Sequence, residues 1–154
     1  MSLEKFIGDP HVDINGMLEK FRHTAEEYGL PFVGSPRICN TRPAQEIRAW
    51  THEKYGQGQA FEEAAFAAYF VGGNNLALPE VLLAIVRDLD LPKDEARKVL
   101  KTRSFRDHVD RDLARAKELG IMSAPTFMAH GKRLVGAHPL GVLKDFAMGK
   151  TLIP

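Results

Sequence analysis

The chain has 154 residues, is 44% hydrophobic and 27% charged, and has a formal net charge of +1, a composition that suits one globular domain with a sizeable core. A net charge near zero predicts no strongly basic surface for nucleic acid or anionic membranes. The sequence also contains no run of about 18 apolar residues, which is the length needed to span a bilayer. We therefore expect neither partner. A single cysteine cannot form an intrachain disulfide, which favours a reducing compartment, and we predict a cytoplasmic location.

Most of the chain shows the periodicity of amphipathic helices. Apolar residues recur at helical spacing, and glycine or proline residues mark the breaks between the periodic segments. Thr41 is a candidate cap for the helix that runs to Gly56. In chain order we expect helices at about residues 3–7, 12–28, 42–55, 59–70 and 79–89, then a short helix that Pro92 starts, and helices at about residues 104–119 and 140–146.

A β-hairpin is predicted within residues 120–136. Pro125 has no amide hydrogen, so it fits the first residue of a strand, and the small Ala124 before it suits a cis bond. The first strand runs into a turn at His130-Gly131, after which a second strand returns. A short helix at residues 140–146 follows the hairpin.

The order of these elements resembles the DsbA-like thioredoxin family, in particular its FrnE-type and 2-hydroxychromene-2-carboxylate isomerase branch. The resemblance extends from about Leu3 to about Phe146. It implies an α/β, thioredoxin-like fold that a large helical insertion and a truncated small sheet make mostly helical. The segments that carry it are Asn40-Thr41, Gly72-Gly73-Asn74-Asn75, Leu78-Pro79-Glu80, Ala124-Pro125-Thr126-Phe127 and Gly136-Ala137-His138-Pro139.

On this resemblance, residues 1–154 form one partial domain, with a helical insertion lobe at 12–119 and a C-terminal β-hairpin plus helix at 120–148. Members of the family begin with a β-α-β segment that carries a Cys-x-x-Cys pair, and nothing before Leu30 has the pattern of a strand. We expect that segment to be missing. The two remaining strands would then form an isolated ribbon, and we predict that self-association as a homodimer covers its exposed edge.

The resemblance also implies site residues. Ala124 and Pro125 would bind substrate, with the backbone of Ala124 pairing with a bound peptide or glutathione. Asn40, Thr41 and His138 match positions near the family's cleft. Helix capping alone also explains Asn40 and Thr41, and a structural role also explains His138.

We predict no catalytic residue in this chain. Cys39 lies in a polar loop before a helix, where a helix N-terminus would favour a thiolate, but no second cysteine could resolve a mixed disulfide. An incidental thiol is the simpler interpretation. The six histidines show no metal-ligand spacing, so we predict no metal, and no cofactor other than glutathione in one of the alternatives below.

Three functions stay open. The first is a thiol–disulfide oxidoreductase or isomerase of the DsbA or FrnE type whose cysteine pair is absent from this chain, so that the chain alone is inactive in disulfide exchange. The second is a glutathione-dependent isomerase of the 2-hydroxychromene-2-carboxylate type, in which Ser can replace the attacking cysteine. The third is a non-catalytic interaction module that uses the open strand edge. The family resemblance implies protein thiols or glutathione as partners.

Overall fold

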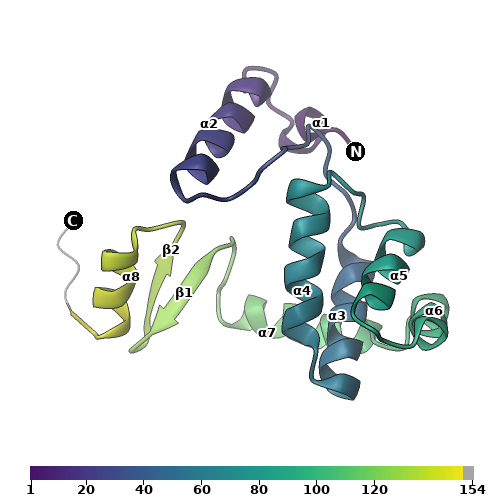
Figure 1. The fold of residues 1–154 in the computed structure, drawn as a ribbon. Coiled ribbons are helices and arrows are strands. Elements are labelled where there is room, and N and C mark those ends of the chain that lie inside the picture. The colour runs from purple at the N-terminus through teal and green to yellow at the C-terminus, as the bar shows by residue number, and fades with distance from the viewer. Residues whose placement is uncertain (151–154) are drawn as a thin grey trace. The chain divides into compact units, whose positions relative to one another are not determined.

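A computed structural model describes residues 1–150 (Figure 1). The chain divides into two compact units, Met1–Val109 and Asp110–Pro154, which we describe separately. The boundary lies inside helix α7 (Arg106–Glu118). The helical insertion lobe at 12–119 and the hairpin plus helix at 120–148 stay predictions. The last four residues of the predicted domain, 151–154, lie outside the described part.

The first unit is helical, as the periodicity predicts. Gly8 and Gly56, both in the left-handed conformation, end the first and third helices, because glycine adopts this conformation without a steric penalty. The helices are α1 (Leu3–Ile7), α2 (Ile14–Glu27), α3 (Arg42–Tyr55), α4 (Gly58–Phe66), α5 (Pro79–Asp88) and α6 (Lys93–Thr102), followed by the start of α7.

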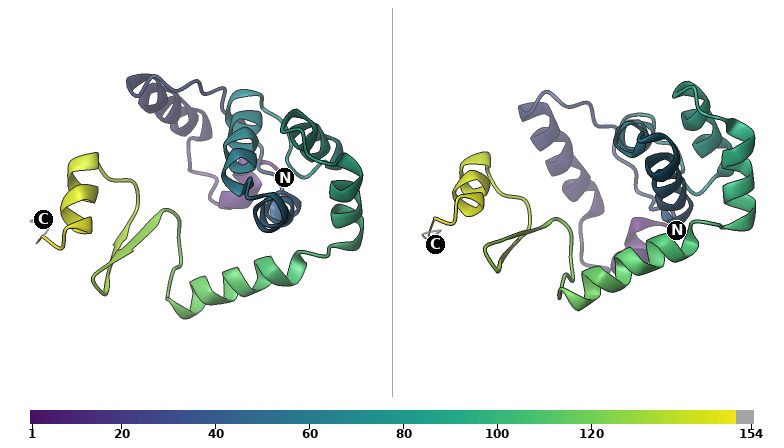
Figure 2. Two further views of the ribbon diagram at one scale, coloured as in Figure 1. Left: turned by 60° about the horizontal axis from the view of Figure 1, so that its bottom comes forward. Right: turned by 90° about the horizontal axis from the view of Figure 1, so that it is seen from below.

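Helices α3, α4, α5 and α6 pack together and enclose the core of this unit (Figure 2). The side chains of Ile47, Leu82 and Val86 have no exposed surface, and Trp50 and Phe61 are almost completely buried. Burial of each such side chain contributes about 1.5–3 kcal/mol, so these helices form the stable part of the chain.

The prediction of one uninterrupted α-helix at 59–70 is wrong at its C-terminal end. α4 ends at Phe66, and a π-helical turn, η1 (Ala67–Val71), follows it. In this turn the Gly72 amide donates to the Ala67 carbonyl oxygen at 3.0 Å, and the Phe70 carbonyl oxygen accepts from the Val33 amide at 2.8 Å. A backbone contact from a distant segment therefore accompanies the wider turn, and local periodicity does not report such a contact.

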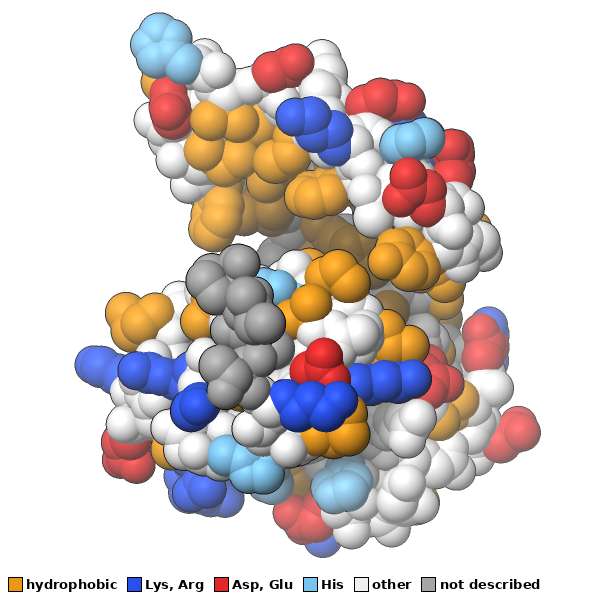
Figure 3. All heavy atoms as spheres, turned by 90° about the vertical axis from the view of Figure 1, so that its left-hand side faces the viewer, with side chains coloured by type: hydrophobic (Ala, Val, Ile, Leu, Met, Phe, Trp, Pro, Cys, Tyr) orange, Lys and Arg blue, Asp and Glu red, His pale blue; other side chains and the backbone are white. Residues whose placement is uncertain are grey.

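Exposed hydrophobic side chains gather around α2 and the segment that follows it, in the upper part of Figure 3. Phe21, Leu30 and Val33 are each more than half exposed. The ring of Phe21 contacts that of Phe32 edge to face, and Phe32 stacks on Phe70. This part of the first unit therefore holds together through surface aromatic contacts and has only one buried residue in its helix, Ile14.

The second unit contains the predicted hairpin. Strand β1 (Thr126–Ala129) pairs antiparallel with β2 (Lys132–Val135), and α8 (Leu140–Ala147) follows. Ala129 lies opposite Lys132, which leaves a two-residue turn in which His130 and Gly131 have φ values of 51° and 70°. Two positive φ values in succession are typical of a type I′ turn, whose twist matches that of the strands. The predicted turn at His130-Gly131 is confirmed.

Candidate functional site

The proline loop, residues 123–126, lies at the start of β1. Ala124 and Pro125 are exposed, and the peptide bond between them is cis. The Thr126 hydroxyl donates to the Ser123 carbonyl oxygen at 2.6 Å, and the Pro125 carbonyl oxygen accepts from the Gly136 amide at 2.8 Å. These two hydrogen bonds hold Ala124 at the surface, directly before the strand.

The outer edge of β1 continues from this loop. Inter-strand hydrogen bonds alternate along an antiparallel pair, and the bond between Pro125 and Gly136 sets the phase. Phe127 therefore directs its amide and carbonyl toward β2, while Thr126 and Met128 direct theirs away from it. The outer edge offers donors and acceptors to another extended segment.

His138 lies in the same unit, in the loop between β2 and α8. Its side chain is half-buried, and its Nε2 atom is 2.9 Å from the Val135 carbonyl oxygen. This contact fastens the loop to the end of β2. The structure thus gives His138 a structural contact, and its place in a cleft stays a prediction.

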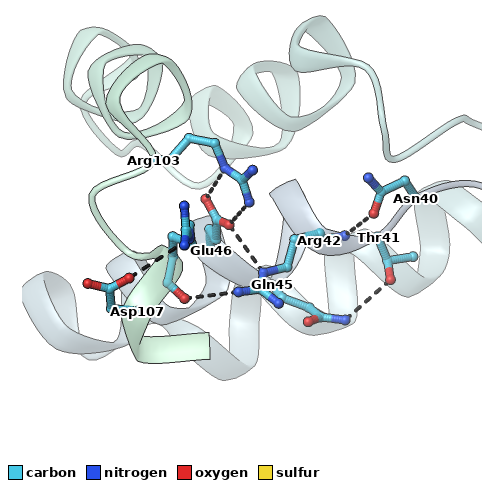
Figure 4. Close-up of polar contacts among 8 residues, drawn as sticks. Asn40, Thr41, Arg42, Gln45, Glu46, Arg103 and Asp107 are labelled. Atoms are coloured by element: carbon cyan, nitrogen blue, oxygen red, sulfur yellow. Dashed lines mark hydrogen bonds and ion pairs between the residues drawn. The ribbon is translucent and has the colours of Figure 1, made fainter. Parts of the chain in front are cut away.

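Asn40 and Thr41 precede α3 in the first unit, and both are exposed (Figure 4). The Asn40 Oδ1 atom accepts from the Arg42 amide at 3.0 Å. The Thr41 hydroxyl accepts from the side chain of Gln45 at 3.3 Å and makes no capping bond to the backbone.

The predicted capping role of Thr41 is therefore wrong with respect to its side chain. Its backbone, with φ −86° and ψ 0°, lacks the extended conformation that a capping side chain needs. Asn40 instead bonds the amide two residues ahead, as Asn side chains do in turns.

The predicted cleft residues are divided between the two units. Asn40 and Thr41 belong to Met1–Val109, whereas Ala124, Pro125 and His138 belong to Asp110–Pro154. The structure brings the proline loop and His138 into one unit. A cleft that all of them share stays a prediction.

A buried carboxylate that was not predicted from the sequence lies close to Asn40. Glu46 is 1% exposed, and its Oε1 atom accepts from Arg42 Nε at 3.2 Å. Its Oε2 atom accepts from Arg103 Nε at 3.2 Å, and Arg103 Nη2 also donates to Oε1 (Figure 4). Arg42 Nη2 donates in turn to the Arg106 carbonyl oxygen at 3.0 Å. The cluster ties α3 to the chain between α6 and α7.

The cluster borders a pocket of about 200 Å³ in the first unit. The sequence pattern that could have revealed the cluster is the position of Arg42 four residues before Glu46, because this spacing places both side chains on one side of a helix. The third member of the cluster, Arg103, lies 57 residues after Glu46, so sequence spacing does not predict its contact. The pocket is lined by Asn40, Arg42, Pro43, Glu46, Ala77, Pro79, Leu100 and Arg103.

Cys39 lies in the loop before α3, where it is half-buried and packs against the core. Tyr69 is close to it. Burial raises the pKa of the Tyr69 hydroxyl, and the nearby Cys39 thiol contributes to the increase. The hydroxyl donates to the Arg37 carbonyl oxygen at 3.0 Å. A packed thiol is consistent with the interpretation of Cys39 as incidental.

Within residues 1–150, no three His, Cys, Asp or Glu side chains come together in a way that could hold a metal ion. In the same part of the chain, no helix has the length and apolar character needed to cross a bilayer.

Comparison with known proteins places these features in a family. Residues 6–147 match the family model of the DSBA-like thioredoxin domain. Among solved structures, the chain is similar to the cytosolic disulfide reductase DsbM from Pseudomonas aeruginosa, with a TM-score of 0.59 and 20% identity. That likeness covers 77% of this chain and 64% of DsbM, and at this identity it shows the fold alone. No curated protein matches the chain. The chain therefore belongs to the DSBA-like thioredoxin domain family, and the predicted thioredoxin-like, mostly helical fold is confirmed.

Proposed function

We propose that the chain takes part in thiol–disulfide exchange by binding, at its proline loop, an extended protein segment that carries the substrate disulfide. Membership of the family supports this class of function. The observation that carries the proposal is the exposed Ala124, held directly before a strand whose outer edge faces away from β2. An extended peptide gains affinity at such an edge from main-chain hydrogen bonds.

A complete exchange cycle needs two thiols. One thiolate attacks the substrate disulfide and forms a mixed disulfide, and a second thiolate displaces the substrate as the pair becomes oxidised. The sequence contains one cysteine, Cys39, so it cannot complete this cycle alone. The chain binds substrate in this proposal, and a dithiol from outside these 154 residues supplies the electrons.

A FrnE-type oxidoreductase is the finer form of the proposal, and the cytoplasm is the compartment in which we place it. A reducing compartment keeps the lone Cys39 as a thiol. The similar DsbM is described as a cytosolic protein, which agrees with this location.

A glutathione-dependent isomerase is the second candidate. The single cysteine favours it, because glutathione carries its own thiol and the protein then needs no redox pair. Under this alternative the loop at Ala124 binds the tripeptide, whereas under the first proposal it binds a longer protein segment. If neither binds, the chain is a non-catalytic interaction module.

An NMR titration of the isotope-labelled chain with two ligands distinguishes these functions. The first ligand is S-carboxymethylated insulin B chain, an extended peptide with blocked thiols, and the second is S-methylglutathione. We expect the insulin peptide to shift the amide resonances of Ala124 and Thr126. Ala124→Pro, which removes one edge amide, should weaken this binding. Ala137→Pro, at an exposed position before α8, is the matched control and should bind normally. Response to S-methylglutathione alone would favour the isomerase, and no response to either ligand would contradict both.

Turnover provides a separate test. We expect the chain to reduce insulin with glutathione no faster than a protein-free blank. Turnover that survives Cys39→Ser would contradict the proposed need for an external dithiol, because the variant contains no thiol.

A further inference from the structure

The segment that leads into the proline loop begins at the C-terminal end of α7. The Gly120 amide donates to the Lys117 carbonyl oxygen at 2.9 Å, and Gly120 has a φ of 66°, in the left-handed region. The Ile121 amide donates to the Ala116 carbonyl oxygen, also at 2.9 Å. This combination is a Schellman motif, which ends a helix and turns the chain away from the helix axis. The chain then continues directly into the proline loop.

Arg133, on β2, contacts the same end of α7. Its Nη1 atom donates to the Gly120 carbonyl oxygen at 2.6 Å and to the Leu119 carbonyl oxygen at 3.3 Å. Both carbonyls lie at the negative end of the α7 dipole, where a positive charge is favourable. Arg133 therefore supplies this helix end with hydrogen-bond donors and with a charge, and it joins α7 to the hairpin.

The contact between Arg133 and α7 requires glycine at position 120. A Cβ atom at this position would overlap Arg133 Nη1. The positive φ of Gly120 also favours glycine, because glycine adopts this conformation without steric cost. Gly120 and Arg133 are 13 positions apart, one before the proline loop and the other after it. The pair therefore closes the stretch of chain that contains the loop.

The proline loop is held to β2 and the residue after it on both of its sides. On the C-terminal side, the Pro125 carbonyl oxygen accepts from the Gly136 amide at 2.8 Å. On the N-terminal side, Arg133 holds Gly120, where the segment that leads into Ala124 begins. A site that is fixed before its ligand arrives loses less conformational entropy on binding. The contact of Arg133 is therefore expected to increase the affinity of the loop for a peptide.

We propose that Arg133 is a positioning residue for the proline loop: it fixes the chain that leads into Ala124 and thereby strengthens the binding of an extended peptide there. The inference rests on the proposed function, because it concerns the same site, and Arg133 acts on that site through the backbone of residues 119–124. Lys132 provides the contrast. It carries the same charge on the same strand, but its side chain lies on the opposite face of the hairpin.

Amide hydrogen exchange of the full chain without ligand tests the positioning. Arg133→Met removes the donors and the charge but keeps a long side chain, and it should speed the exchange of the Gly120 and Ile121 amides about tenfold. Arg133→Lys keeps the charge and a donor, so it should exchange within about threefold of the wild type. Lys132→Met is the matched control and should leave both rates unchanged. Unchanged rates in Arg133→Met would overturn the proposal, whether or not the chain binds a peptide.

The NMR titration with S-carboxymethylated insulin B chain gives the second readout. Arg133→Met should weaken binding about tenfold, whereas Lys132→Met should weaken it less than about twofold. Equal weakening by the two variants would overturn the proposal, because it would reflect only the loss of a positive charge near a carboxymethylated peptide. Circular dichroism verifies that the variants fold. If the wild-type chain binds no peptide, the proposed function fails, and the exchange rates still decide whether Arg133 positions the loop.

Discussion

Arg103 has a left-handed backbone, with φ 54°, and its Nε atom lies 3.2 Å from the carboxylate of Glu46, 57 positions earlier in the chain. A left-handed conformation costs a residue other than glycine about 1–2 kcal/mol. The conformation directs the guanidinium onto a carboxylate that is 1% exposed and that also accepts a hydrogen bond from Arg42. A buried charge is stable only when partners of this kind compensate it. The ion pair therefore joins the C-terminal end of α6 to the second turn of α3.

Glu46→Gln should destabilise the first unit by about 2 kcal/mol, because it removes the buried charge that two arginines surround and turns an amide NH2 group toward their donors. Chemical denaturation followed by circular dichroism measures the loss. The control is Glu62→Gln, which removes the partner of Arg48 at a site where both side chains are 45% exposed. That change should cost less than about 1 kcal/mol. Equal losses for the two variants would contradict a buried ion-pair cluster.

Arg103→Gly and Arg103→Ala both remove the ion pair, but they differ in the backbone. We expect the glycine variant to be more stable than the alanine variant by about 1 kcal/mol, because glycine adopts a positive φ without steric cost. At Arg97, inside α6, the order should reverse, since glycine is about 1 kcal/mol less favourable than alanine in a helix. Thermal or urea unfolding of the four variants gives both differences.

Tyr55 should ionise at an unusually high pH. Its hydroxyl donates to Glu95 Oε2 at 2.7 Å, and this hydrogen bond, with smaller contributions from desolvation and from the charge of Glu95, raises its pKa. The folded state thus favours the neutral hydroxyl. The resulting stabilisation is present below the unfolded tyrosine pKa of about 10 and is lost as the pH rises through the folded value.

An ultraviolet titration measures this ionisation, and Tyr55→Phe assigns the signal. Glu95→Gln should lower the pKa of Tyr55, because it removes both the charge and the strong acceptor. A Tyr55 pKa that is the same with glutamate and glutamine at position 95 would show that the hydrogen bond has no such effect.

Thr126→Val should loosen the proline loop. The hydroxyl of Thr126 donates to the Ser123 carbonyl oxygen at 2.6 Å, and valine keeps the shape of the side chain without the donor. We expect a loss of about 1 kcal/mol in the stability of the loop and faster amide hydrogen exchange at residues 123–126. Thr126→Ser retains the hydroxyl and should exchange nearly as slowly as the wild type. If valine and serine behave alike, the hydroxyl does not hold the loop.

The local pattern of the sequence predicted most of the elements. Helical spacing located the helices, and Pro125 with His130-Gly131 located the hairpin and its turn. These features depend on side-chain periodicity and on the φ angles that individual residues prefer, and both are properties of short segments. The order of the elements then indicated the thioredoxin-like fold that the family match confirms.

The features that could not be predicted from the sequence depend on long-range contacts. The burial of Glu46 depends on Arg103, and the π-helical turn accompanies a hydrogen bond between Val33 and the Phe70 carbonyl oxygen. Neither partner lies within one helical turn of the residue that it affects, so neither left a mark in the local periodicity.

The sequence by itself determined most of the secondary structure, the family resemblance and the limit that a single cysteine places on redox chemistry. The tertiary structure decided which polar side chains are buried and which backbone groups face outward. It placed Glu46 between two arginines and left the uncharged edge of β1 facing away from β2. The reason is physical: periodicity and turn propensity act over a few residues, whereas burial and edge pairing depend on segments that meet only after the chain has folded.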